Sequence, residues 1–321
     1  TQAIGWSHRV FSVPVWAELS LDTHDVLAGD LRIDIDTRYS DYHDGGVVGV
    51  LGDDGRIQAY EIDTVFDDHI ELKRPASFET LGARIVPLRF ARALDGFTFE
   101  RDGSAYIRAK ATLSAYDTRD LAYDDWPSYR GARVMLDRHA MIGSLSDRVS
   151  WPLDVFDNGT GLIETEIQTS WARNRMGIGF IKQGHEAIWQ VRRWLHARKG
   201  RWKAFYIPTW NRDLEVLDTI TSAALGINIR SISWGVYLDE ADIMIQLRNG
   251  TRFFRHISGV TAIPDGEQIT IDNSLGQEVA PDDIDFICFL YLVRLDADSV
   301  TIEHRPAQSA TISISVIEVP A

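Results

Sequence analysis

Short apolar runs separated by turn residues make up most of the chain. Positions 309–317 alternate between apolar and polar residues, as expected of a strand with one buried face. Positions 286–293 are continuously apolar, as expected of a strand buried on both faces. Asn249-Gly250 and Asp265-Gly266 lie between such runs and favour tight hairpin turns. The pattern therefore predicts a mainly β protein.

One segment departs from this pattern. Ile188, Val191 and Leu195 recur at helical spacing, which places them on one face of a helix. We predict a single central α-helix at 185–199, followed by an aromatic strand at 205–210.

The aromatic strand has a twin near the start of the chain. Positions 11–16 read FSVPVW and positions 205–210 read FYIPTW. Further matches follow in the same order along the chain: Gly55 with Gly250, Ile62 with Ile257, Val65 with Val260, and 85–92 with 287–294. Because the order is kept, the sequence predicts a duplicated β-barrel or β-sandwich module.

The repeat divides the chain into three parts. The first copy of the module is expected at 1–117 and the second at 200–321. The segment 118–199 is expected to hold a linker, a small β-sheet and the helix at 185–199.

Charge is distributed unevenly along the chain. The net charge is −14, which argues against a surface that coats nucleic acid. Between 171 and 203 there are nine Lys and Arg residues and one acid, so this stretch carries +8 and the remainder −22. The stretch is either a solvated helix face or a docking patch for an acidic neighbour, such as another copy of the chain. The candidate subunit-interface residues are Arg173, Arg175, Arg192, Arg193, Arg198 and Lys199.

Two of these cations, Arg192 and Arg193, lie off the apolar stripe of the predicted helix. Replacing both with Glu is therefore expected to spare folding and to block assembly.

Motifs that carry catalysis or cofactor binding are not found. The sequence contains no phosphate-binding loop, no H-E-x-x-H and no G-x-S-x-G, and its nine histidines lack metal-ligand spacing. Cys288 is the only cysteine, so the chain forms no internal disulfide. The acidic stretch Asp34–Asp44 either holds a calcium ion or is a solvated loop. We expect no enzyme activity, no catalytic residue, no cofactor and no metal.

Two further features bear on location and binding. No apolar run is long enough to span a bilayer, and the amino terminus lacks the pattern of a signal peptide, so no membrane anchor is expected. Ten tryptophans suggest sugar stacking, but half of them belong to the predicted helix and strand or to the twin strand, and core packing is the favoured explanation for these: Trp16, Trp189, Trp194, Trp202 and Trp210.

Trp171 and the segment 184–210, GHEAIWQVRRWLHARKGRWKAFYIPTW, resemble the distal tail and tail-hub proteins of long-tailed bacteriophages with flexible tails. In that family a strand-rich half leads to a helix, a basic residue with Gly, and an aromatic strand that ends at Pro. The family forms rings of β-sandwich and barrel modules at the tail tip. This sequence departs from the family by carrying a second module at its amino terminus, which leaves open whether it is a distal tail or a hub component.

The resemblance implies a structural virion protein that is assembled in the host cytoplasm and located at the tail tip. Its implied partners are other copies of itself in a hexameric or trimeric ring, the tail tube protein, and tip, spike or fibre proteins, with DNA passing transiently through the lumen. Three copies of a duplicated chain would present six similar faces and so join a six-fold tube to a three-fold tip. The alternatives are a carbohydrate-binding β-sandwich adhesin of the virion and a glycan-degrading tail enzyme.

Overall fold

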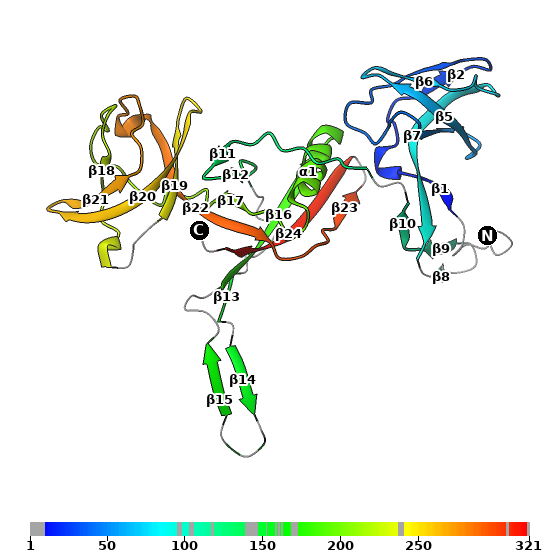
Figure 1. Ribbon diagram of the computed structural model, residues 1–321. Helices are drawn as coiled ribbons and strands as arrows, with labels where there is room; N and C mark the ends of the chain where they lie inside the picture. The colour runs from blue at the N-terminus through cyan, green and yellow to red at the C-terminus, as the bar shows by residue number, and fades with distance from the viewer. Residues whose placement is uncertain are drawn as a thin grey trace. The chain divides into compact units, whose positions relative to one another are not determined.

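The computed structural model of the chain describes residues 10–94, 98–102, 106–116, 119–138, 147–151, 153–157, 159, 161, 163–167, 173–236, 241–305 and 308–319. Across these residues the protein is mainly β, with one α-helix and three short 3-10 helices (Figure 1). The predicted fold class is therefore confirmed.

Packing divides the chain into two units. The first contains 1–121, 182–192 and 304–310, and the second contains 122–181, 193–303 and 311–321. This grouping follows packing rather than the repeat, so the three-part division of the sequence stays a prediction.

The first unit is built on one sheet and one separate hairpin. The sheet has the strand order β1-β7-β4-β5-β6-β3, with β2 and β10 also paired to β7, and the hairpin is β8-β9. The strands are β1 (Phe11–Pro14), β2 (His24–Val26), β3 (Arg32–Asp34), β4 (Val47–Leu51), β5 (Ile57–Val65), β6 (His69–Leu72), β7 (Thr80–Ala93), β8 (Thr98–Asp102), β9 (Tyr106–Lys110) and β10 (Leu113–Ala115).

The second unit repeats this topology. Its main path contains the strand order β17-β22-β19-β20-β21-β18, with β24 also paired to β22. The strands are β17 (Phe205–Pro208), β18 (Gly226–Ile229), β19 (Ala241–Leu247), β20 (Arg252–Ile263), β21 (Gly266–Ile271) and β22 (Ile284–Leu295). Two further strands, β23 (Ile302–Arg305) and β24 (Ser309–Glu318), each have part of their residues in the first unit.

The two modules also agree in register. Phe11 lies opposite Ala91 in the first module, and its counterpart Phe205 lies opposite Val293 in the second. The register continues through β4 and β5, where Val47 pairs with Glu61, as Asp242 does with His256 in β19 and β20. The pairing therefore follows the alignment that the sequence predicts.

Irregular features of the sheet are repeated as well. The strand β5 is irregular between Ile62 and Thr64, and β20 between Ile257 and Gly259. Because a bulge is a specific local feature of a fold, its recurrence supports a true duplication.

The two hydrophobic cores use equivalent positions. Both are clusters of buried, mainly aliphatic side chains. The equivalent core residues are Val26 and Ile220, Ile33 and Ile227, Val48 and Ile243, Val50 and Ile245, Ile62 and Ile257, Ile70 and Ile269, Leu72 and Ile271, and Ile85 and Ile287.

The remaining strands belong to the middle of the chain. These strands are β11 (Ser128–Tyr129), β12 (Ala132–Val134), β13 (Asp147–Ser150), β14 (Leu153–Asp157), β15 (Ile163–Ile167) and β16 (Arg173–Gln183). The strand β12 pairs in parallel with β17, β16 pairs with β13 and β24, and β14 and β15 form a separate two-stranded sheet.

The α-helix, α1 (His185–Arg198), lies where it is predicted and ends one residue earlier. Lys199 and Gly200 both take a left-handed backbone, with φ of 52° and 62°, and so terminate it. The 3-10 helices are η2 (Trp16–Glu18), η3 (Trp234–Val236) and η4 (Pro281–Asp283). Trp171, which contributes to the family resemblance, lies outside the described residues.

Candidate functional site

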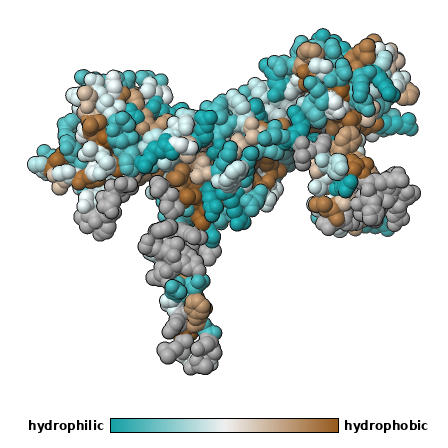
Figure 2. Space-filling view, viewed as in Figure 1, coloured by the Kyte–Doolittle hydropathy of each residue, from teal (hydrophilic) through white to brown (hydrophobic). Residues whose placement is uncertain are grey.

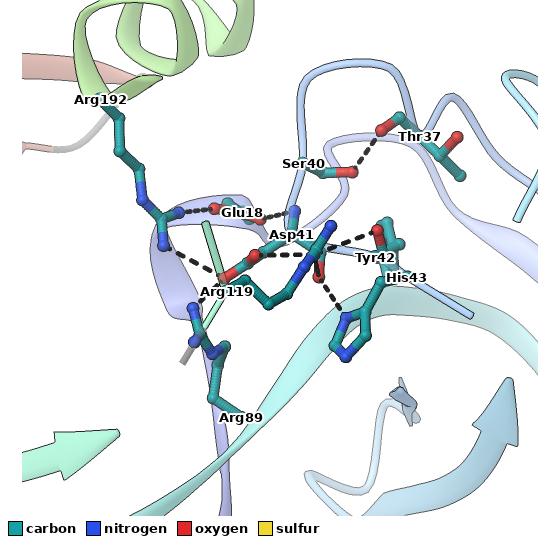
Figure 3. A network of polar contacts seen from close by, with 9 residues as sticks. All are labelled: Glu18, Thr37, Ser40, Asp41, Tyr42, His43, Arg89, Arg119 and Arg192. Carbon is teal, nitrogen blue, oxygen red and sulfur yellow. Dashed lines mark hydrogen bonds and ion pairs between the residues drawn. The ribbon is translucent and has the colours of Figure 1, made fainter. Parts of the chain in front are cut away.

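A buried cluster of charged side chains lies in the first unit. At its centre is Asp41, in the segment between β3 and β4, whose side chain is fully buried. Its carboxylate accepts hydrogen bonds from Arg89 of β7, from Arg119 at 3.1 Å and from Arg192 of α1 at 3.1 Å (Figure 3). Three guanidinium groups from distant parts of the sequence therefore meet at one carboxylate.

A second carboxylate, that of Glu18 in η2, completes the cluster. It accepts a hydrogen bond of 2.8 Å from Arg192 and one of 2.6 Å from the backbone N–H of Asp41 (Figure 3). Burial raises the pKa of Glu18 to about 7; the Arg192 charge lowers this pKa and the Asp41 charge raises it. Glu18 is therefore poised to gain or lose a proton near neutral pH.

The arrangement joins separate elements of the first unit. Oδ2 of Asp41 accepts hydrogen bonds from Arg89 and Arg192, and Oδ1 accepts one from Arg119. Buried ion pairs of this kind contribute little net stability, but losing one partner is costly because the other charge stays buried. The cluster thus holds the middle of α1, η2 and β7 in one arrangement.

The second module does not repeat this cluster. The position equivalent to Glu18 is Arg212, and the position equivalent to Arg89 is Tyr291. Arg212 instead lies 3.5 Å from Asp285 at the surface. The cluster therefore distinguishes the first module from the second.

A pocket of about 210 Å³, lined by both polar and apolar side chains, adjoins the cluster. Glu18, Tyr42 and His185 contribute to its lining. The hydroxyl of Tyr42 and Nε2 of His185 are buried without a hydrogen-bond partner. Burial raises the pKa of Tyr42, as does the nearby charge of Glu18, and burial lowers the pKa of His185. A pocket of this size has room for water, which can hydrogen-bond to polar groups of this type.

The cations predicted to form an interface are spread over several local contacts. Arg192 is held in the buried cluster, and the guanidinium of Arg193 lies 4.0 Å from the centre of the Tyr123 ring. Arg175 Nε lies 3.2 Å from Asp296. These cations are therefore engaged inside the chain, and their role in subunit contacts stays a prediction.

The remaining predicted cations differ in exposure. Arg198 is 4% exposed and forms an ion pair with Asp124, and burial lowers its pKa to about 10. Lys199 is exposed, and its Nζ lies 5.5 Å from the centre of the Trp202 ring. Arg173 belongs to β16, but its side chain lies outside the described residues.

The second unit has a buried carboxylate of its own, Asp242 of β19, which is 7% exposed. It accepts a hydrogen bond of 2.8 Å from the hydroxyl of Tyr129, and Arg130 and His256 lie 3.3 Å and 3.0 Å from it. Burial raises the pKa of the nearby Tyr206 to about 12, with the charge of Asp242 adding to the shift. These contacts tie the β11–β12 region to the second module.

The acidic stretch Asp34–Asp44 is not a single site. Asp36 forms an exposed ion pair with Arg38 at 2.7 Å, and Asp44 accepts a hydrogen bond from the backbone of Val65. Asp41 is buried in the cluster, so the interpretation of this residue as part of a solvated loop is wrong. Among the described residues, no three His, Cys, Asp or Glu side chains are placed to hold a metal ion.

Sequence reasoning did not identify Glu18, Arg89 or Arg119 as members of a common site. They lie far apart in the sequence and belong to no motif, so only the fold brings them together.

Comparisons with known proteins give no further assignment. No protein-family model matches the sequence, and no curated protein matches it. Within the described part of the chain, no helix is long and apolar enough to cross a membrane.

Proposed function

We propose that the chain is a structural component of the tail tip of a long-tailed bacteriophage with a flexible tail. In this proposal it forms a distal tail or hub ring that joins the tail tube to the tip or receptor-binding complex. The observation that carries the proposal is the duplicated module, in which the strand order β1-β7-β4-β5-β6-β3 recurs as β17-β22-β19-β20-β21-β18.

A duplicated module suits a ring that lies between layers of different symmetry. Subunits of a closed ring repeat one heterologous contact around an axis. A chain with two equivalent modules supplies two similar faces, so three chains supply six. Such a ring can therefore meet a six-fold tube on one side and a three-fold tip on the other.

The two modules differ in the contacts that they make with the rest of the chain. The Glu18–Asp41–Arg192 cluster belongs to the first module alone, whereas the parallel pairing of β12 with β17 belongs to the second. The two modules are therefore similar in topology but are held to the rest of the chain by different contacts.

The acidic balance of the chain also fits the proposal. With a net charge of −14, a wall made from this chain repels the phosphates of DNA and lets it pass without binding.

Labelling of assembled particles tests the proposal. Antibodies raised against the purified chain should label one end of the tails of particles made with it, where the tube meets the tip. The same antibodies absorbed with purified chain provide the control. Particles that contain no such chain, or that carry the label along the tube or on the capsid, would overturn the proposal.

A further inference from the structure

The β14–β15 hairpin has an unusual position in the fold. It pairs with no other strand of the described chain, and it extends away from the sheet of its unit in Figure 1. An isolated two-stranded hairpin is at best marginally stable in water and needs a further packing surface. The hairpin therefore calls for an explanation.

Large apolar side chains are exposed along this hairpin. Leu153, Val155 and Ile163 are 48%, 59% and 61% exposed, and the preceding Trp151 is 50% exposed. Figure 2 shows brown, hydrophobic atoms on this projection as well as teal, hydrophilic ones. Apolar side chains concentrated on a projecting element are typical of an interaction surface.

The hairpin is also uniformly acidic. Between 153 and 167 there are four carboxylates, Asp154, Asp157, Glu164 and Glu166, and no Lys or Arg. The pairing places Asp154 opposite Glu166, and like charges in this position destabilise a hairpin. A partner that covers it should therefore combine cationic groups with an apolar surface.

The turn that follows α1 has this combination. Residues 199–203 read KGRWK, with three cations around Trp202, which is 74% exposed. The left-handed residues Lys199 and Gly200 hold the turn at the end of the helix. Arg201 is anchored by Asp298, whose carboxylate accepts its backbone N–H at 3.0 Å. We call residues 199–203 the basic turn.

Hairpin and basic turn do not meet within one copy. Both belong to the second unit, and within the described residues β14 and β15 pair only with each other. The two surfaces are complementary in charge and in apolar character, so a second copy can satisfy both.

We propose that the β14–β15 hairpin of one copy docks on the basic turn of the neighbouring copy. This inference rests on the proposed function, because it identifies a contact that repeats around the ring. The contact joins two different surfaces, so it is heterologous and generates a closed ring or an open filament.

Charge exchange tests the contact directly. Sedimentation velocity of the purified chain over a range of concentrations gives its association constant. Glu166→Lys and Lys203→Glu should each weaken association by about tenfold or more, and the double variant should regain most of the loss. Glu71→Lys makes the same charge change at an exposed position of β6 and should leave association unchanged.

Apolar substitution provides a second, independent measurement. Val155→Ser changes an exposed side chain, so it should leave the circular dichroism spectrum unchanged while weakening association.

Three results would overturn the contact. The first is a chain that stays monomeric at all concentrations, and the second is association unaffected by Glu166→Lys and Lys203→Glu. The third is a double variant whose association constant is no higher than that of the more weakly associating single variant. Labelling at the tail tip would still decide the proposed function, so failure of the contact and failure of the function are distinguishable.

Discussion

Arg192 of α1 donates a hydrogen bond of 2.8 Å to Glu18, a residue that precedes it by 174 positions. The same guanidinium reaches Asp41, so one helical side chain bridges two carboxylates of the first module. This relationship changes the interpretation of the cationic helix. Its charges are largely used to hold the chain together, so Arg192→Glu is now expected to destabilise the first unit rather than to spare folding.

The first prediction concerns this bridge. Arg192→Met leaves Asp41 and Glu18 buried with fewer cationic partners, so the first unit should lose about 3 kcal/mol of unfolding free energy. Hydrogen exchange of the β4 and β7 amides measures this loss. Arg38→Met is the control in the same unit, because its exposed pair with Asp36 is worth at most about 1 kcal/mol. Equal protection of these amides from hydrogen exchange in Arg192→Met and Arg38→Met would refute the structural role of the bridge.

The second prediction concerns pH. Because the pKa of Glu18 is raised to about 7 in the folded chain, the folded state binds the proton more tightly than the unfolded state. The resulting stabilisation is fully present below pH 4.5 and is lost as pH rises through 7. Over this pH range the unfolding free energy of the wild type should fall by on the order of 3 kcal/mol relative to that of Glu18→Gln. Urea unfolding of both proteins at a series of pH values measures the difference, and parallel profiles would contradict the prediction.

The third prediction uses the single thiol. Cys288 is fully buried, and burial raises its pKa to about 11. Only about a thousandth of the thiol is ionised at pH 8, and the thiolate is the reactive form. A disulfide reagent should therefore label the folded chain very slowly and the urea-unfolded chain rapidly, at one site. Rapid labelling of the folded chain would show that β22 is not buried as described.

The fourth prediction tests the equivalence of the modules. Gly55 and Gly250 occupy the same turn in the two copies, both with positive φ and with open space around them. Alanine at either position should lower the free energy of unfolding by about 1 kcal/mol, because the left-handed backbone disfavours a side chain. Hydrogen exchange of the neighbouring strands should show that Gly55→Ala destabilises only the first unit and that Gly250→Ala destabilises only the second.

A natural control is present in the second module. Gly259 has open space around it, and its equivalent in the first module is Thr64. Gly259→Thr should therefore be tolerated. A large loss at this position, with none at Gly55 and Gly250, would contradict the equivalence.

Much of the fold could be predicted from the sequence because it depends on local signals. The match of 11–16 with 205–210 and the two turn glycines indicated the duplication, and the spacing of Ile188, Val191 and Leu195 indicated the helix. The prediction that 286–293 is buried on both faces throughout is wrong at one position, because Tyr291 is 38% exposed.

The buried cluster could not be predicted in the same way. Asp41 belongs to an acidic stretch typical of a solvated loop, and its partners Arg89, Arg119 and Arg192 are distant in the sequence. Helical periodicity identified one apolar stripe of α1, but contacts made by its charged residues depend on the tertiary fold. The resemblance to tail-tip proteins is likewise a pattern, so the function stays a proposal.

The symmetry of the assembled ring, seen in class averages along its axis, tests the central claim most directly. The account predicts three chains per ring, with six similar modules arranged around the lumen. Six chains per ring, with only one module of each lining it, would contradict the account.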